Sequence, residues 1–294
     1  MNLYFETYSG IAGNMTIASL LDLGADKEVL IKALESMEFG EYELEFDRVK
    51  KNGIDGLMFD VNLHHHKENN CKCGGNCKTH EGHHHHEHNH DEEEHHHHHE
   101  EGHKCKCHGE EHHHHEHRNI EDVFRIIESG DFSDKVKEDA KGIFSIIARA
   151  ESKAHGVDVD KVHFHEVGAV DSIIDIVGTC VLIENLGVEN IYFTDLYEGY
   201  GFVKCAHGNM PVPVPAVVNI VAEANLPLNI INDEGEHITP TGAAIVAYFS
   251  QGKPDFAFSI KRIGIGAGSR EFKNTTNILR VMEIENTSKK KLYR

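Results

Sequence analysis

The stretch KVHFHEVGAVDSIIDIVG, residues 161–178, places imidazole and carboxylate groups among apolar residues. His163 and His165 are separated by one residue, so on an extended segment both rings lie on the same side. Glu166 follows directly, and groups of these types bind divalent transition metals or transfer protons. We therefore expect His163, His165 and Glu166 to bind metal, with His165 and Glu166 also candidates for catalysis.

Two carboxylates follow in the same stretch. Asp171 and Asp175 are four residues apart, which places both side chains on one face of a helix. A buried carboxylate without a partner is costly, so each needs a ligand or an ion pair. We expect Asp171 to act in catalysis and Asp175 to bind metal. The alternative is structural: Asp171 caps the helix, and Asp175 pairs with Arg149 or Lys153.

A third ligand-bearing segment is KCAHGNMPVPVPA, residues 204–216. It places Cys205 and His207 after a predicted strand and before a proline-rich loop. Imidazole and thiolate are good ligands for borderline and soft divalent ions. We expect His207 to be a further metal ligand.

Glycine-rich turns could supply amides for phosphate groups. YSGIAGNM contains Gly10 and Gly13 between a predicted strand and a predicted helix. EHITPTGAA contains Thr239, Thr241 and Gly242 at a predicted helix N-terminus, which suits anion binding. We expect these five residues to bind a cofactor, although a threonine N-cap explains the second turn equally well.

The segment RIGIGAGSRE, residues 262–271, is a third glycine-rich stretch. It lies after or within a predicted strand and enters no clear helix. Glycine in a strand often marks a place where another backbone or a ligand approaches closely. The sequence leaves these two interpretations open.

Residues 64–117 hold 22 of the 27 histidines and five of the seven cysteines, interspersed with acidic residues. Their spacing is irregular, which argues against a structural zinc site and for a flexible segment that binds several ions. Without apolar periodicity, this insertion is expected to be disordered when metal-free. Composition alone does not choose nickel over zinc, copper or cobalt.

The rest of the chain alternates predicted strands with amphipathic helices, which is typical of α/β proteins. We predict a mixed sheet with flanking helices, interrupted by the long insertion. The core domain is expected to comprise residues 1–63 and 118–285, and residues 286–294 form a basic tail. Helices are predicted at 14–25, 27–37, 120–129, 133–156, 168–187, within 211–225 and at 239–252, and strands at 2–10, 41–63, 190–199, 256–268 and 277–285.

Composition excludes several functional classes. The 294 residues carry a formal net charge of −20, so a nucleic-acid partner is not expected. No apolar stretch is long enough to cross a bilayer, and no signal peptide is evident. We therefore expect a cytoplasmic protein without a membrane partner, in which clustered cysteines bind metal.

Several segments together resemble the LarC nickel-insertion proteins. They are YSGIAGNMTIASLLDLGA, VHFHEVGAVDSIIDIVG, CAHGNMPVPVPA, ITPTGAA and RIGIGAGSREF, in the order found in that family. A histidine-rich loop lies between the first and the second. The resemblance covers nearly the whole chain.

The resemblance implies an enzyme of nickel-cofactor biosynthesis. Such proteins insert nickel into pyridinium-3,5-bisthiocarboxylic acid mononucleotide, which completes the nickel-pincer cofactor of lactate racemase and related enzymes. The metal becomes bonded to two sulfurs and a ring carbon. CTP is consumed with the help of Mg²⁺ or Mn²⁺. Because the metal becomes bonded to a ring carbon, the resemblance implies a cyclometallase of the lyase class.

The chain departs from the family pattern at three points. Asn14 stands where the family has an acid, and Glu6 stands where it often has Asp. Full-length members continue into a C-terminal domain that carries the nucleotide site, whereas this sequence stops at NTSKKKLYR. We expect a companion polypeptide to supply that domain, and a second copy of the chain is another candidate partner.

Two other functions remain open from the sequence. The histidine-rich insertion could be the whole function, which would make the protein a nickel store or metallochaperone. A metal-dependent phosphotransferase or hydrolase of another family is the third hypothesis. Deletion of the insertion, or release of phosphate from nucleotides by this chain alone, would discriminate among them.

Overall fold

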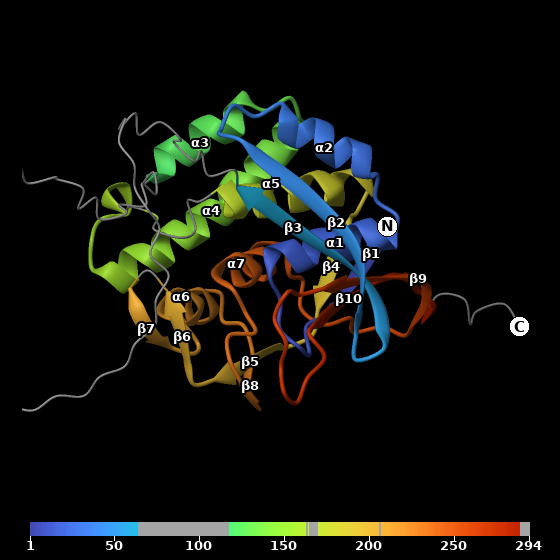
Figure 1. The fold of residues 1–294 in the computed structure, drawn as a ribbon. Helices are drawn as coiled ribbons and strands as arrows, with labels where there is room; N and C mark the ends of the chain where they lie inside the picture. Colours follow the sequence, from blue (N-terminus) through green and yellow to red (C-terminus); the bar gives the residue numbers. More distant parts are fainter. Residues whose placement is uncertain (64–117, 163, 165–169, 206, 289–294) are drawn as a thin grey trace, which may run out of the picture. The chain divides into compact units, whose positions relative to one another are not determined.

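A six-stranded mixed sheet forms the centre of the fold (Figure 1). The structure is a computed structural model and describes residues 1–63, 118–162, 164, 170–205 and 207–288. The strand order is β2-β3-β9-β10-β1-β4, with β1–β4 and β3–β9 parallel and the other pairs antiparallel. The strands are β1 (Asn2–Glu6), β2 (Tyr42–Lys51), β3 (Ile54–Leu63), β4 (Asn190–Phe193), β9 (Phe258–Ala267) and β10 (Ile278–Asn286).

Two small sheets extend this framework. Strand β5 (Leu196–Tyr200) pairs in parallel with β8 (Leu228–Glu234). Strand β6 (Phe202–Cys205) forms an antiparallel hairpin with β7 (Gly208–Pro211). The hairpin and the loop that follows β8 border the cavities described below.

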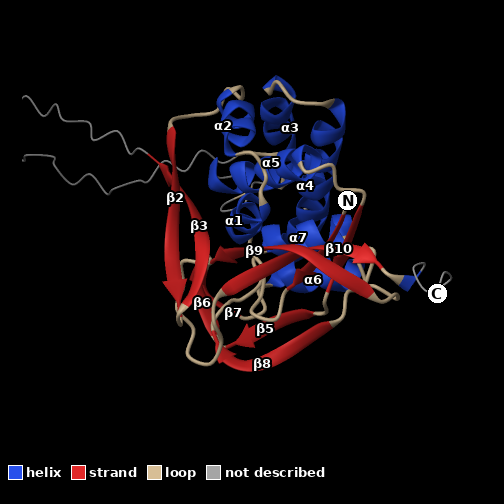
Figure 2. Ribbon diagram, turned by 90° about the vertical axis from the view of Figure 1, so that its right-hand side faces the viewer, coloured by secondary structure: helices blue, strands red, loops and turns tan. Residues whose placement is uncertain are grey.

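The helices gather on one side of the main sheet (Figure 2). Helix α1 packs on β3, β9 and β10 and contacts α5, while α4 packs on α5, α6 and α7. The helices are α1 (Gly13–Leu23), α2 (Lys27–Glu35), α3 (Ile120–Ser129), α4 (Asp134–His155), α5 (Val170–Asn185), α6 (Pro215–Glu223) and α7 (Pro240–Phe249), with a 3₁₀ turn at Val159–Lys161.

Helix α1 approaches the sheet closely because β9 carries glycines beneath it. A Cβ atom at Gly264 would lie 2.1 Å from the Ser19 carbonyl oxygen, and one at Gly266 would lie 2.1 Å from that of Met15. Any side chain at either position would push the helix away from the strand. The glycine-rich stretch therefore has the close-backbone role that the sequence allowed.

Local signals fix the ends of α4. The N-cap is Ser133, whose side chain accepts a hydrogen bond from the backbone N–H of Val136 at 3.1 Å. Gly156 ends the helix in the left-handed conformation, with φ of 67°. The apolar face between these ends contributes Ile143, Phe144 and Ile147 to the core.

The predicted α/β class with a mixed sheet is confirmed, but some strands differ. The single strand expected at 190–199 is divided into β4 and β5, because the chain leaves the main sheet at Thr194. There the Thr194 hydroxyl accepts from the Thr7 backbone N–H at 2.9 Å. Strands β6, β7 and β8 were not predicted from the sequence.

The predicted insertion at 64–117 lies outside the described residues, as do His163, His165 and Glu166. The division into a core, an insertion and a basic tail therefore stays a prediction. Within the described ranges, no helix combines the length and the apolar character needed to cross a membrane.

Candidate functional site

Two neighbouring cavities contain most of the predicted site residues that the structure describes. The first, which we call the acidic cavity, has a volume of about 330 Å³. It is lined by Ala12, Asn14, Met15, Asp171, Ser172, Asp175, Glu236, His237, Thr239, Pro240, Thr241, Gly268, Ser269, Arg270, Phe272 and Asn277. The second, the apolar cavity, has a volume of about 490 Å³ and shares Glu236, Pro240 and Arg270 with the first.

Asp175 lies where the N-terminal ends of α1 and α5 meet. Its carboxylate accepts a hydrogen bond from the backbone N–H of Asn14. Gly13 makes this approach possible, because a Cβ atom there would lie 2.5 Å from the Cβ of Asp175. The glycine predicted to bind a cofactor thus has a packing role against a predicted metal ligand.

The environment of Asp175 makes its carboxylate a stronger base than an exposed one. Removal of water by the surrounding protein, and then the Asp171 carboxylate, raise the pKa of Asp175 well above its usual range. The side chain still lines the acidic cavity and is partly exposed. A carboxyl group with a raised pKa at a cavity wall is suited to accept and hold a proton.

Asp171 lies one helical turn before Asp175 and is exposed. Its Oδ1 accepts a hydrogen bond from the backbone N–H of Ser172 at 2.8 Å. The pair of Asp175 with Arg149, one of the two structural alternatives, is not observed, because Arg149 forms its ion pair with Glu223 at 2.7 Å. Both carboxylates therefore face the cavity, as the helical spacing predicted.

Asn14 occupies the position where an acid is usual in the family that the sequence resembles. Its Oδ1 accepts from the backbone N–H of Met15 at 2.8 Å, and its Nδ2 donates to the Phe59 carbonyl oxygen at 3.4 Å. The side chain therefore fixes the start of α1 and connects it to β3. It also lines the acidic cavity.

The two glycine-rich turns that were predicted to bind phosphate pack directly against each other. The Ile11 backbone N–H donates to the His237 carbonyl oxygen at 3.0 Å, and a Cβ atom at Gly10 would lie 2.0 Å from that oxygen. Gly10 also has φ of +88°, which favours glycine. A Cβ atom at Gly242 would lie 2.1 Å from the Ile11 carbonyl oxygen.

The N-terminus of α7 is capped by its own threonine. The Gly242 backbone N–H donates to the Thr239 hydroxyl oxygen at 3.1 Å, and the hydroxyls of Thr239 and Thr241 are 2.8 Å apart. The N-cap alternative is thus observed for Thr239. Cofactor binding by Gly10, Gly13, Thr239, Thr241 and Gly242 stays a prediction, and the amides of Gly10 and Gly242 already have protein partners.

A buried carboxylate supports the loop before α7. Glu198 on β5 accepts hydrogen bonds from the backbone N–H groups of Gly199 and His237 at 2.8 and 2.6 Å. Its side chain is fully buried, and burial raises its pKa to about 7. Sequence reasoning missed Glu198, because nothing in LYEGY distinguishes an inward carboxylate from an exposed one.

His237 forms one wall of the acidic cavity. Its ring stacks on Phe272 with centroids 3.7 Å apart and an interplanar angle of 13°. Asp233 holds the adjoining loop, since its carboxylate accepts from the backbone N–H of Asn274 and, at 2.8 Å, from the Thr275 hydroxyl. These residues come from segments far apart in sequence, so local spacing gave no signal for them.

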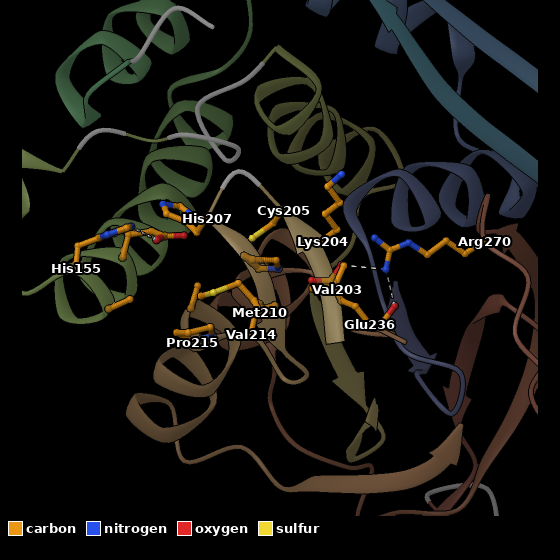
Figure 3. Close-up of a pocket in the computed structure, with 14 residues that line it drawn as sticks. His155, Val203, Lys204, Cys205, His207, Met210, Val214, Pro215, Glu236 and Arg270 are labelled. Carbon is orange, nitrogen blue, oxygen red and sulfur yellow. Dashed lines mark hydrogen bonds and ion pairs between the residues drawn. The ribbon is translucent and has the colours of Figure 1, made fainter. Parts of the chain in front are cut away.

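The apolar cavity lies between the β6–β7 hairpin and the starts of α6 and α7. Figure 3 shows His155 and His207 at one end, Arg270 and Glu236 at the other, and Cys205 and Met210 between them. The rings of His155 and His207 have centroids 4.9 Å apart. His207 thus lies in the neighbouring cavity rather than beside Asp171 and Asp175.

The predicted metal ligands are brought together only in part. Asp171 and Asp175 line one cavity and His207 lines the other, while His163, His165 and Glu166 lie outside the described residues. Among the residues that the structure describes, no group of three His, Cys, Asp or Glu side chains forms a ready metal site. The metal-binding assignments therefore remain predictions.

The family assignment follows from comparison of the whole sequence. The family model described as "Nickel insertion protein" matches residues 3–293. The chain belongs to this family. It contains the glycine-rich turn, the paired aspartates and the threonine cap described above.

Individual relatives agree with this assignment. A protein from Alkaliphilus metalliredigens is 45% identical over 289 residues, covering 96% of this chain and 60% of the relative. A Clostridium kluyveri protein is 39% identical, with coverage of 95% and 61%, and one from Acetivibrio thermocellus is 35% identical, with coverage of 92% and 57%. All three are named "Pyridinium-3,5-bisthiocarboxylic acid mononucleotide nickel insertion protein".

The chain spans about 60% of the length of these relatives. No solved structure matches it. The cavities described here are therefore read from the geometry of this chain alone.

Proposed function

We propose that this chain is the nickel-handling part of an enzyme that inserts nickel into pyridinium-3,5-bisthiocarboxylic acid mononucleotide. The family and the names of the relatives support the reaction class. The structural support is the acidic cavity, which unites the Gly10–Asn14 turn, the paired aspartates and the start of α7. These segments lie far apart in sequence, and residues from each of them line this one cavity.

The chemistry requires a base and metal ligands. When nickel bonds to a ring carbon, that carbon loses its proton, and a protein group must accept it. Asp175 is suited to this step by its raised pKa, and Asp171, His165 and Glu166 remain the predicted catalytic residues. His163, His165, Glu166, Asp175 and His207 remain the predicted nickel ligands.

The requirement for CTP and Mg²⁺ or Mn²⁺ is a separate part of the proposal. Carboxylates such as Asp171 and Asp175 fit a hard cation of this kind. The amides of Gly10 and Gly242, however, already bond to protein oxygens, so they are poor candidates for a triphosphate. We therefore propose that a companion polypeptide supplies the nucleotide site and that the assembly acts in the cytoplasm on the cofactor of lactate racemase-type enzymes.

The test is reconstitution. The chain is incubated with nickel, CTP, Mg²⁺ and the bisthiocarboxylate mononucleotide, with and without a separately made C-terminal domain, and the product is followed by mass spectrometry. We expect nickel-containing product only when both polypeptides are present. Absence of product in the complete mixture, with both polypeptides folded, would contradict the proposal.

Nickel storage is the second candidate function, favoured by the histidine and cysteine content of residues 64–117. A store would bind several nickel ions through that segment and would have no need of the acidic cavity. Nickel binding that is unaffected by substitutions in the cavity, combined with no product in the reconstitution, would favour this function.

A further inference from the structure

Arg270 lies at the border of the two cavities and lines both. Its Nη1 is 3.1 Å from the Glu236 carboxylate and donates to the Glu236 carbonyl oxygen at 3.1 Å. Figure 3 shows this pair at one end of the apolar cavity. The guanidinium is therefore held where a ligand extending from one cavity to the other would have to pass.

Arg270 is positively charged, whereas the other charged side chains of the acidic cavity are carboxylates. The acidic cavity is lined by the carboxylates of Asp171, Asp175 and Glu236, and Arg270 is the only lysine or arginine among its described lining residues. A phosphate group entering this space needs a cation to offset the carboxylates. Arg270 is also the only cation that the two cavities share.

Arg270 has unused hydrogen-bond donors, and hydrogen bonds from other residues hold its backbone in place. Within the described part of the chain, its Nε and Nη2 make no hydrogen bond, while Nη1 bonds to Glu236. Its backbone carbonyl accepts from Asn277 Nδ2 at 3.0 Å and from Lys51 Nζ at 3.4 Å. An arginine guanidinium recognises phosphate through paired N–H donors, so the unused edge matches such a group.

We propose that Arg270 anchors the phosphate group of the mononucleotide, with Glu236 holding the guanidinium in position beforehand. The proposal rests on the proposed function for the identity of the ligand. The phosphate lies at the border of the two cavities, and the pyridinium ring extends into the acidic cavity, toward Asp171 and Asp175. That placement agrees with the proposed role of Asp175 as the acceptor of the ring proton.

The existing ion pair does not oppose this role. The Arg270 side chain is 47% exposed, and ion pairs that reach solvent contribute little to stability. A phosphate can therefore add to the free edge of the guanidinium, or replace Glu236, at small cost. The requirement for a phosphate would also distinguish the mononucleotide from its dephosphorylated nucleoside.

The test compares Arg270→Gln with Arg149→Gln, a matched control. Arg149 forms an ion pair with Glu223 and is 46% exposed, but it lines neither cavity. Affinities for the mononucleotide, its dephosphorylated nucleoside and CTP are measured by calorimetry with the full chain. We expect Arg270→Gln to weaken mononucleotide binding by about 10- to 100-fold, the effect of one charged hydrogen-bonding group. Nucleoside binding should change by less than about twofold, and Arg149→Gln should change neither.

The outcomes separate this proposal from the one on which it rests. If the unmodified chain binds neither mononucleotide nor nucleoside, the proposed function is wrong. If it binds the mononucleotide and Arg270→Gln binds it equally well, only the role of Arg270 is wrong. A loss confined to CTP would assign the anchor to the nucleotide instead and would overturn the proposal as stated.

Inorganic phosphate gives a readout that does not need the mononucleotide. The Arg270 Nε–H signal in the NMR spectrum should shift on titration with phosphate, while the corresponding signal of Arg149 should not. Glu236→Gln should enlarge the response, because it removes a competing negative charge. Equal responses of the two arginines would contradict the proposal, whichever result the mononucleotide gives.

Discussion

At the scale of single residues, environment decides what each carboxylate can do. Asp171 is exposed at the first turn of α5, whereas Asp175, one turn later, is surrounded by protein and contacts Gly13. The spacing of the two aspartates was readable from the sequence because it is local. Their different environments depend on α1, which the sequence could not place against α5.

Asp175→Asn tests the proposed proton acceptor. The amide oxygen can still accept from the Asn14 N–H, so the fold should persist, while the basic group is lost. We expect the reconstituted rate to fall by about 100-fold or more. Asp195→Asn, at an exposed ion pair with Lys253, serves as the control and should retain the rate. A rate within a few fold of the unmodified chain would exclude Asp175 as the base.

The raised pKa of Asp175 also predicts the direction in which Asp175→Asn changes the stability of the fold. Because the pKa of Asp175 is raised in the folded state, the folded chain binds more protons than the unfolded chain as pH rises above the ordinary carboxylate value. Ionisation therefore costs stability at neutral pH. Asp175→Asn removes that cost, so its unfolding free energy in urea at neutral pH should be no lower than that of the unmodified chain.

Glu198 provides a second pH prediction. Its pKa rises from an ordinary value of 4.5 to about 7 on folding, so its contribution is fully present below pH 4.5 and is lost as pH rises through 7. The stability of Glu198→Gln relative to the unmodified chain should therefore increase by about 2 kcal/mol between about pH 5 and pH 8. Urea unfolding at both pH values measures this difference, and a constant offset would show that Glu198 stays ionised in the fold.

At the scale of elements, the helices were better predicted than the strands. The helices expected at 120–129 and 133–156 match α3 and α4, because both carry strong periodicity and local capping signals. Strand β8 was missed because LNIINDE has polar residues on both faces. The lining of the acidic cavity followed the same rule: the sequence placed Asp171 and Asp175 on one helix face, whereas Arg270 and His237 reach the cavity only through loop packing.

The contact between α1 and β9 can be tested directly. Gly266→Ala places a Cβ atom 2.1 Å from the Met15 carbonyl oxygen, so α1 or β9 must shift. We expect a loss of about 2–3 kcal/mol in unfolding free energy, typical of overpacking in a core. Ile263→Ala on the same strand is the control. Because Ile263 is half exposed, its truncation should lower the unfolding free energy far less. Equal losses of unfolding free energy in the two variants would show that the close contact between α1 and β9 does not determine the cost of Gly266→Ala.

At the scale of the whole molecule, the described residues on the two sides of the predicted insertion form one hydrophobic core. The buried apolar residues run from Leu3 to Phe59 and from Val123 to Ile284. Both described parts of the chain thus contribute buried residues to this core. Proteins tolerate changes in surface segments when no core contact is lost.

Replacement of residues 64–117 by a short glycine–serine linker should therefore leave the fold intact. We expect thermal unfolding to change by only a few degrees, whereas the number of bound nickel ions measured by equilibrium dialysis should fall sharply. If the insertion only feeds metal to the site, product formation should recover at high nickel concentration. Failure to recover, with the fold intact, would assign the insertion an essential role.

Strand β10 is the last strand in the described part of the chain, yet it lies inside the main sheet between β9 and β1. The main sheet consequently cannot be completed until residue 286 has left the ribosome. Until then, β1 can pair with β4 on one edge, but its other edge lacks β10 and is exposed to neighbouring polypeptides. Nascent chains of this protein should therefore depend on chaperones until synthesis has passed this strand.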